Sequence, residues 1–196
     1  MKLSHILILI LLVFSACTNT TDTEPATSQA NNTTANANTQ VIKPVDRASL
    51  TQEITKVENE LYNSKSFSFN AQKANAVVSA YSQFTSAYPQ DAKTPEYLFK
   101  SAEIYRSLKQ YQKAVTTYQT ICDKYPDFEK KPHSLFLMGF SYENDLKNLD
   151  EAKKAYQIFL DKHPGHELAK DVTFSLSNLG RAPEDIIKEF EKNKKK

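Results

Sequence analysis

The chain has 196 residues, with 25 basic and 23 acidic side chains and a formal net charge of +2 at pH 7. This near balance gives no electrostatic case for nucleic-acid binding, which depends on a concentrated basic surface. With three glycines, two cysteines and no tryptophan, the composition also gives no sign of a glycine-rich phosphate loop or a cysteine-rich framework.

The first sixteen residues have the features of a signal peptide. A lysine near the start is followed by an apolar run over residues 6–14 and then by two small residues and Cys17. This run suits the hydrophobic region of a signal peptide and is shorter than the ~20 residues that span a bilayer. The tetrapeptide at 14–17, Phe-Ser-Ala-Cys, resembles the lipobox of bacterial lipoproteins, although the family usually has leucine at its first position.

The lipobox resemblance implies a fate for this end of the chain. Residues 1–16 would be removed as a lipoprotein signal peptide, and Cys17 would become an acylated N-terminus. The alternative is ordinary secretion with a free cysteine. If Cys17 is acylated, only Cys122 remains, so no disulfide within the chain is possible. Cys122 lies in an apolar helical run, where a cysteine usually acts as a small buried hydrophobe.

Residues 17–46 follow as a polar segment of Thr, Asn, Ala, Ser and Gln with few large apolar side chains. Such a composition cannot bury enough surface to offset the entropy lost on ordering. We therefore predict a disordered tether with a root-mean-square reach of roughly 30 Å.

Residues 47–196 are predicted to form one all-α domain. Apolar residues recur at helical spacing, beginning with Leu50, Ile54 and Val57, and no sustained alternating run indicates a strand. Ser49, with Gln52 three residues later, is a candidate capping box for the first helix.

A repeat of about 37 residues organises this domain. Prolines preceded by an aromatic or histidine recur at Pro89, Pro126 and Pro164, which are 37 and 38 residues apart. The other recurring positions are tyrosines, alanines and small residues: Tyr81, Tyr118 and Tyr156; Ala114 and Ala152; Ala102, Gly139 and Ser177. This pattern resembles the tetratricopeptide repeat (TPR), a helix–turn–helix unit of about 34 residues.

The TPR resemblance implies a right-handed α-solenoid of about three and a half helix pairs. The expected repeats span about 48–89, 94–126 and 131–164, followed by a half repeat and cap over 167–192. A closing helix from Pro183 is expected to lay its apolar residues on the last pair as a cap: Ile186, Ile187 and Phe190.

In TPR proteins the first helix of each pair lines a groove that binds partners. By this resemblance the recurring phenylalanines Phe99, Phe136 and Phe174 are candidates for the groove surface, with the core as the alternative place for them. The other candidate groove residues are Glu103, Arg106, Phe140 and Glu143. An aromatic groove with mixed charge suits a peptide or a partner helix.

Signals for catalysis, metal or cofactor binding are poor. His163 and His166 flank a Pro-Gly pair near Asp161, but two imidazoles on a turn make a weak metal site. We expect no enzyme activity, no metal and no cofactor.

These observations together predict a membrane-anchored interaction scaffold. Lipoproteins with TPRs look like two envelope families, the lipoprotein subunit of the outer-membrane β-barrel assembly machine (BamD) and the periplasmic coordinator of the Tol-Pal system (CpoB). The lipobox favours the first family. This resemblance implies a protein partner in the cell envelope and a location at the outer membrane, facing the periplasm. A lipoprotein that binds a glycan or small molecule is a third interpretation, which the absence of tryptophan disfavours.

Overall fold

The computed structural model describes residues 46–63 and 69–194. Every regular element in these two ranges is a helix, which confirms the predicted all-α fold. The elements are α1 (Arg47–Tyr62), α2 (Ala71–Ala87), α3 (Thr94–Ser107), α4 (Tyr111–Lys124), α5 (Lys131–Phe140), the π-helix η1 (Ser141–Asp145), α6 (Leu149–Lys162), α7 (Ala169–Ser177) and α8 (Pro183–Lys194). The predicted signal peptide, Cys17 and nearly all of the predicted tether lie outside the described residues.

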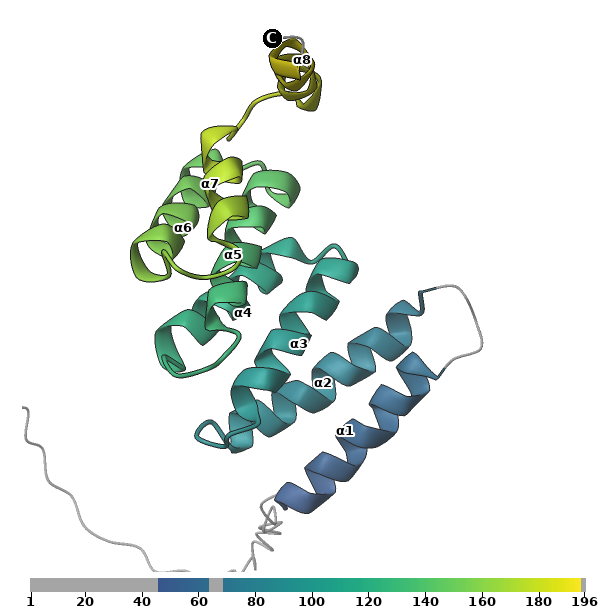
Figure 1. The fold of residues 1–196 in the computed structure, drawn as a ribbon. Helices are drawn as coiled ribbons and strands as arrows, with labels where there is room; N and C mark the ends of the chain where they lie inside the picture. The colour runs from purple at the N-terminus through teal and green to yellow at the C-terminus, as the bar shows by residue number, and fades with distance from the viewer. Residues whose placement is uncertain (1–45, 64–68, 195–196) are drawn as a thin grey trace, which may run out of the picture. The chain divides into compact units, whose positions relative to one another are not determined.

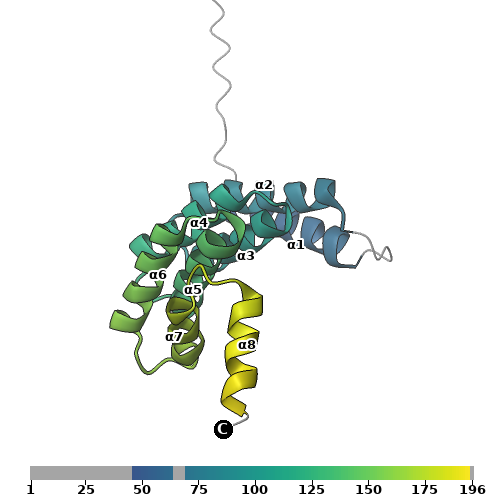
Figure 2. The ribbon, with the colours of Figure 1, turned by 90° about the horizontal axis from the view of Figure 1, so that it is seen from above.

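The helices pack in sequence as pairs of an α-solenoid (Figure 1). The pairs are α1/α2, α3/α4 and α5/α6, and each second helix also packs against the first helix of the next pair. Figure 2 shows the two resulting rows. We call α1, α3, α5 with η1, and α7 the first-helix row, and α2, α4 and α6 the second-helix row.

The first helix begins earlier than the capping-box prediction placed it. Asp46 is the N-cap, and its carboxylate accepts hydrogen bonds from the backbone N–H groups of Ala48 and Ser49. Ser49 therefore lies inside the first turn and donates its hydroxyl to Asp46. The predicted cap was wrong because Asp46, three residues before Ser49, already satisfies the free N–H groups of the first turn.

Most of the small residues of the repeat pattern lie where paired helices approach each other, whereas Ser177 at the end of α7 is exposed. Ala102 in α3 and Ala114 in α4 are fully buried, beside the equally buried Tyr118. In the next pair Gly139 lies against the ring of Tyr156. A Cβ atom at Gly139 would lie 2.6 Å and 2.7 Å from two carbons of that ring. The pattern therefore marks the closest contacts within the pairs.

Particular residues mark where the first helices begin and where the chain turns after them. Pro95 and Pro132 occupy the first turns of α3 and α5, where the missing N–H costs nothing. Lys109 and Lys147 have φ angles of 59° and 55° in the turns that follow α3 and η1. Gly180 has a φ of 77° after α7, a left-handed conformation that glycine adopts without strain.

The C-terminal helix forms where it was predicted, but it covers the last pair only in part. Ile186 is half-buried, whereas Ile187 and Phe190 are 57% and 54% exposed. The expected cap with three buried apolar residues is therefore wrong for two of them, because α8 does not pack along the length of α7. The helix instead reaches α7 through Phe190, whose ring lies 6.1 Å from that of Phe174.

Candidate partner-binding surface

The structure places the seven candidate groove residues at very different depths. Phe99 is buried, Phe174 is 47% exposed, and Glu103 is exposed on α3. The remaining four are half-buried: Arg106, Phe136, Phe140 and Glu143. The first-helix row therefore presents a mixture of partly covered rings and charges.

Phe99 belongs to the core and is not available to a partner. Its ring contacts those of Tyr118 and Phe128, with centroids 6.0 Å and 6.3 Å away. The ammonium of Lys130 lies 5.2 Å from the centroid of the Phe99 ring and pairs with Glu96 at 2.8 Å. The segment between α4 and α5 thus covers Phe99, which corrects its assignment to the groove.

Phe136 and Phe140 form the aromatic part of the surface at the third repeat. Their ring centroids are 6.3 Å apart, and Phe136 also lies 6.4 Å from the ring of Tyr156. Phe136 is thus held against the core on one side. Such a rigid, half-exposed ring can be covered by a ligand at little cost in side-chain entropy.

The centre of the surface is a cluster of four residues from consecutive elements, which we call the Arg106 cluster: Arg106, Tyr118, Phe140 and Asp145. The guanidinium of Arg106 lies 5.1 Å from the centroid of the Phe140 ring. Its Nε lies 3.5 Å from Oδ2 of Asp145, and neither atom has a hydrogen bond in the part of the chain that the structure describes. The cluster therefore joins the second repeat to the third by charge and stacking.

Asp145 reaches this cluster because η1 holds one extra residue. In α3 the N–H of Leu108 bonds to Ile104, four residues back, whereas at the equivalent place Leu146 bonds to Ser141, five residues back. The insertion explains why the third repeat mark follows the second by 38 residues and not 37. π-Helical insertions of this kind often accompany functional sites.

A tyrosine–carboxylate pair recurs in the outer repeats and is missing from the middle one. The Tyr81 hydroxyl donates to Glu58, and the Tyr156 hydroxyl donates to Glu143 at 2.8 Å. Arg106 takes the place of these carboxylates in the second repeat. The hydroxyl of Tyr118 is left buried without a hydrogen bond among the described residues. The carboxylate of Glu143 is therefore already bonded to Tyr156, whereas Arg106 makes no hydrogen bond of this kind with Tyr118.

Burial has a clear effect on the ionisable groups here. Desolvation raises the pKa of Tyr118 well above the ordinary tyrosine value, although the nearby Arg106 opposes it. Desolvation also raises the pKa of Glu103. Burial opposes ionisation of Glu58 too, but hydrogen bonds from Lys100 and Tyr81 outweigh it and lower the pKa of that carboxyl. The buried Tyr118 hydroxyl is therefore neutral at physiological pH.

Glu58, Tyr118 and Asp145 were not among the residues predicted for the surface. Tyr118 recurs with Tyr81 and Tyr156 in the repeat pattern, and it is fully buried. Glu58 and Asp145 carry a weaker signal. Asp145 lies beside the extra residue of the third repeat, and Glu58 lies within α1, outside the recurring positions of the repeat pattern.

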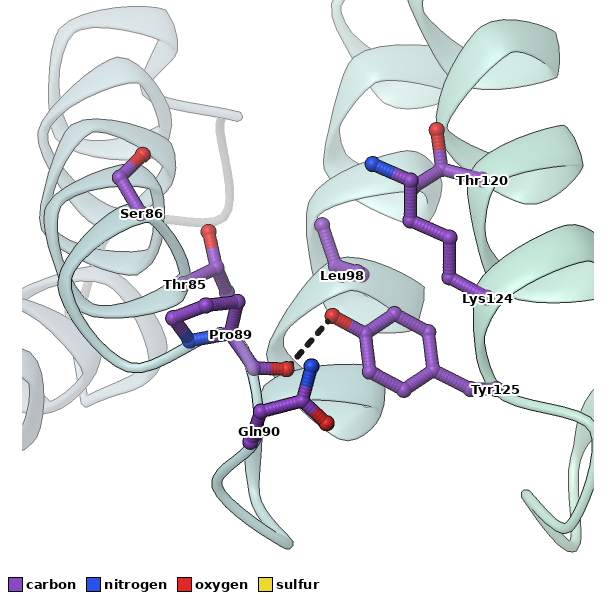
Figure 3. A pocket seen from close by; sticks show the side chains of 8 residues that line it. All are labelled: Thr85, Ser86, Pro89, Gln90, Leu98, Thr120, Lys124 and Tyr125. Carbon is purple, nitrogen blue, oxygen red and sulfur yellow. Dashed lines mark hydrogen bonds between the residues drawn. The ribbon is translucent and has the colours of Figure 1, made fainter.

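A cleft lies between the first two repeats, at the ends of α2 and α4 (Figure 3). Its volume is about 550 Å³, and its lining includes the hydroxyl side chains of Thr85, Ser86 and Thr120. The Tyr125 hydroxyl donates to the carbonyl of Pro89 at 3.0 Å across its edge. The lining contains no carboxylate or imidazole that could activate these hydroxyls as nucleophiles.

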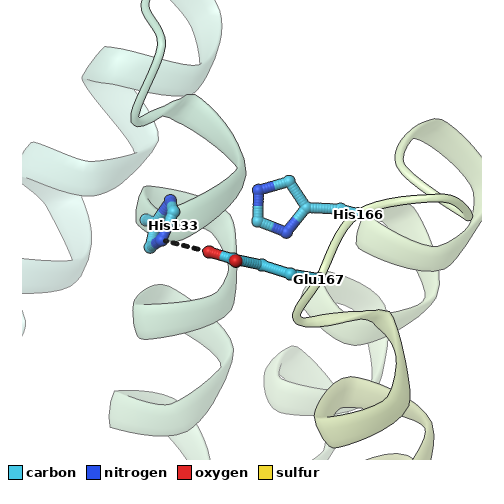
Figure 4. A group of neighbouring side chains, drawn as sticks. All are labelled: His133, His166 and Glu167. Atoms are coloured by element: carbon cyan, nitrogen blue, oxygen red, sulfur yellow. Dashed lines mark ion pairs between the residues drawn. The ribbon is translucent and has the colours of Figure 1, made fainter.

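Three side chains with metal-binding atoms meet at the start of α5 and α7 (Figure 4): His133, His166 and Glu167. Nε2 of His133 lies 3.8 Å from Oε1 of Glu167. However, Nδ1 of His166 accepts a hydrogen bond from the N–H of Leu168 at 3.1 Å. The neutral ring then carries its proton on Nε2, whereas a metal-binding histidine donates from its second nitrogen. Two ligands remain, fewer than protein zinc sites use.

The grouping differs from the one suggested by the sequence, which placed His163 and Asp161 with His166. Asp161 instead accepts a hydrogen bond from Gln157. Cys122 is half-buried, and this burial raises the pKa of its thiol to about 11. Little thiolate is present at neutral pH, so Cys122 is a poor nucleophile.

Comparison with known proteins supports the repeat assignment. A tetratricopeptide repeat model matches residues 96–127 and 133–166, which are the α3/α4 and α5/α6 pairs. The chain therefore contains tetratricopeptide repeats, a fold that typically serves as a non-enzymatic scaffold for protein binding. The Arg106 cluster lies within the two matched repeats. A search of the curated proteins finds no match.

None of the helices within 46–63 and 69–194 has the length and apolar character needed to cross a membrane.

Proposed function

We propose that the protein is a lipid-anchored scaffold of the bacterial cell envelope, which binds a segment of a partner protein on its first-helix row. The observation that carries this proposal is the Arg106 cluster. It places a half-buried ring, Phe140, beside an ion pair that is only partly exposed. Aromatic and arginine side chains in partly desolvated surroundings are the usual anchors of protein interfaces.

The charges around the cluster favour a partner of mixed character. Lys100 pairs with Glu58 at 2.8 Å, and Lys130 pairs with Glu96 at the same distance, so each pair joins neighbouring repeats. The carboxylate of Glu103 has no ion pair or hydrogen bond among the described side chains. The surface therefore has no single sign of charge, and shape and aromatic contacts would decide affinity more than long-range attraction.

The anchor and the location are part of the proposal and depend on the sequence. The lipobox ending at Cys17 supports attachment to a membrane by acyl chains, and the polar segment after it supports a flexible connection to the repeats. The combination of a lipobox with TPRs resembles the BamD subunit. We therefore place the protein at the periplasmic face of the outer membrane, in the assembly of outer-membrane proteins.

Substituting Phe140 by alanine should weaken partner binding by roughly tenfold or more, the usual effect at an aromatic anchor. The measurement is the amount of partner recovered with tagged protein from solubilised envelopes, quantified by mass spectrometry. Ile158→Ala is the matched control, since Ile158 is a 41% exposed apolar residue of α6 in the second-helix row. Equal recovery by the Phe140→Ala variant and the unmodified protein, at equal helicity, would contradict the proposal.

A further inference from the structure

The last first helix, α7, lacks the neighbour that the earlier pairs have. Among its residues only Val172 is buried, on the side that faces α6. The helix ends at Ser177, and the left-handed turn at Gly180 follows at once. This turn comes earlier than the corresponding turns at Lys109 and Lys147, which follow longer first helices. The chain therefore turns away from α7 sooner than it turns away from α3 or η1. The helix that follows, α8, does not pack along α7 as α4 packs along α3 and α6 along α5.

The helix that follows takes a different place. Figures 1 and 2 show that α8 does not continue the row of α2, α4 and α6. It lies beyond α7 in Figure 1 and beside α7 in Figure 2, in both cases on the side away from α6. Phe174, which it touches, is the repeat equivalent of Phe136. The C-terminal helix thus contacts α7, the last helix of the row that we assign to the partner.

Two contacts hold α8 there. The rings of Phe190 and Phe174 stack with centroids 6.1 Å apart and an angle of 29° between their planes. Nη2 of Arg181 donates to the carboxylate of Glu189 at 2.6 Å. Together with Ile186, these residues surround a cavity of about 370 Å³. An amphipathic helix thus docks by two apolar residues four positions apart and an acidic residue between them.

The docking is loose by the standard of the other helices. Phe174 and Phe190 keep 47% and 54% of their surfaces exposed, while Tyr156 and Phe159 of α6 are fully buried. The cavity between α7 and α8 shows that the two helices do not interdigitate. Undocking of α8 therefore exposes little apolar surface that is now buried and costs little free energy. A helix that fits the site better can replace it.

We propose that the surface formed by Phe174 and Arg181 is a helix-binding site, that α8 is its internal occupant, and that the site takes an amphipathic helix of the partner protein in exchange for α8. This inference rests on the proposed function and names the partner's chemistry. The partner helix carries two large apolar residues at positions i and i+4 and an acidic residue at i+3. In the free protein α8 competes with it at the high local concentration that a short connection provides.

The test uses the full chain and a fluorescent peptide with the sequence of residues 183–194. In a variant with Glu189→Lys and Phe190→Ala, α8 loses both contacts and frees the site. This variant should bind the peptide about tenfold more tightly than the unmodified chain, where the tethered helix competes. Adding Phe174→Ala should abolish binding. Equal binding by the released and unmodified chains, or none at about 1 mM peptide, would overturn the inference.

A charge exchange tests the same site without removing an apolar residue. In the Arg181→Glu chain, repulsion from Glu189 weakens the docking of α8. A peptide carrying Glu189→Lys should then bind this chain more tightly than the unmodified peptide does. The reverse order would overturn the inference. If the peptides fail while Phe140→Ala still weakens partner recovery, the inference alone falls, whereas loss of both effects removes the proposed function.

Discussion

Replacing Gly139 by alanine is expected to lower the melting temperature of the domain by roughly 5 °C. The new methyl group would lie 2.6 Å and 2.7 Å from the ring of Tyr156 and 3.3 Å from Cβ of Ala155. The ring is fully buried and its hydroxyl is bonded to Glu143, so it cannot turn away freely. Alanine gains about 1 kcal/mol in helix propensity, but a forced shift of the packed helices costs about 1–3 kcal/mol, and two contacts below 3 Å with a fixed ring place this site at the upper end of that range.

The chain offers a matched control at another glycine. Among the described residues beyond its two chain neighbours, no atom lies within 4 Å of a Cβ added at Gly165, and its backbone is not left-handed. Gly165→Ala should therefore leave the melting temperature unchanged or raise it slightly, because alanine reduces the freedom of the unfolded chain. Thermal unfolding followed by circular dichroism gives both values. An unchanged melting temperature for Gly139→Ala would mean that α5 and α6 do not approach as closely as described.

Replacing Cys17 by serine is expected to move nearly all of the protein from the membrane fraction to the soluble fraction. Each buried methylene of an acyl chain contributes about 0.8 kcal/mol, so the chains of a bacterial lipoprotein bind the membrane almost irreversibly. Within the described residues no helix offers a second way to span a membrane. The measurement is sedimentation of washed membranes followed by immunoblotting.

Cys122→Ser is the control for this experiment, because it removes the other cysteine and leaves the lipobox intact. It should leave the protein in the membrane fraction. Sedimentation of the Cys17→Ser variant with membranes, even after a high-salt wash, would show that attachment does not depend on the acylated cysteine.

The architecture was accessible from the sequence because repeated packing leaves a repeated pattern. The prolines and the small residues have local causes, such as a helix start or a close approach, and these act within one repeat. The candidate surface was harder to predict. Phe99, Phe136 and Phe174 occupy the same repeat position, yet their exposure differs because their neighbours differ. Phe128 and Lys130 cover the first, and α8 partly covers the last.

Some features depend on geometry that spacing alone does not specify. The spacing of 38 residues indicates one extra residue in the third repeat, but not that Asp145 points to Arg106 in the second. In the same way, the apolar residues of the closing helix predict a cap without saying which side of α7 it covers. The early turn at Gly180 decides this, because it redirects the chain before a second helix can stack.

The most direct test of the scaffold proposal is photo-crosslinking in living cells from both rows of helices. A photoreactive residue is placed at Ser107 or Asn144 in the first-helix row, and at Gln112 or Gln157 in the second-helix row, all of which are exposed. The proposal predicts a crosslinked partner from Ser107 and Asn144, lost on Phe140→Ala, and none from the other two positions. Crosslinks of equal strength from both rows, or only from the second-helix row, would contradict it.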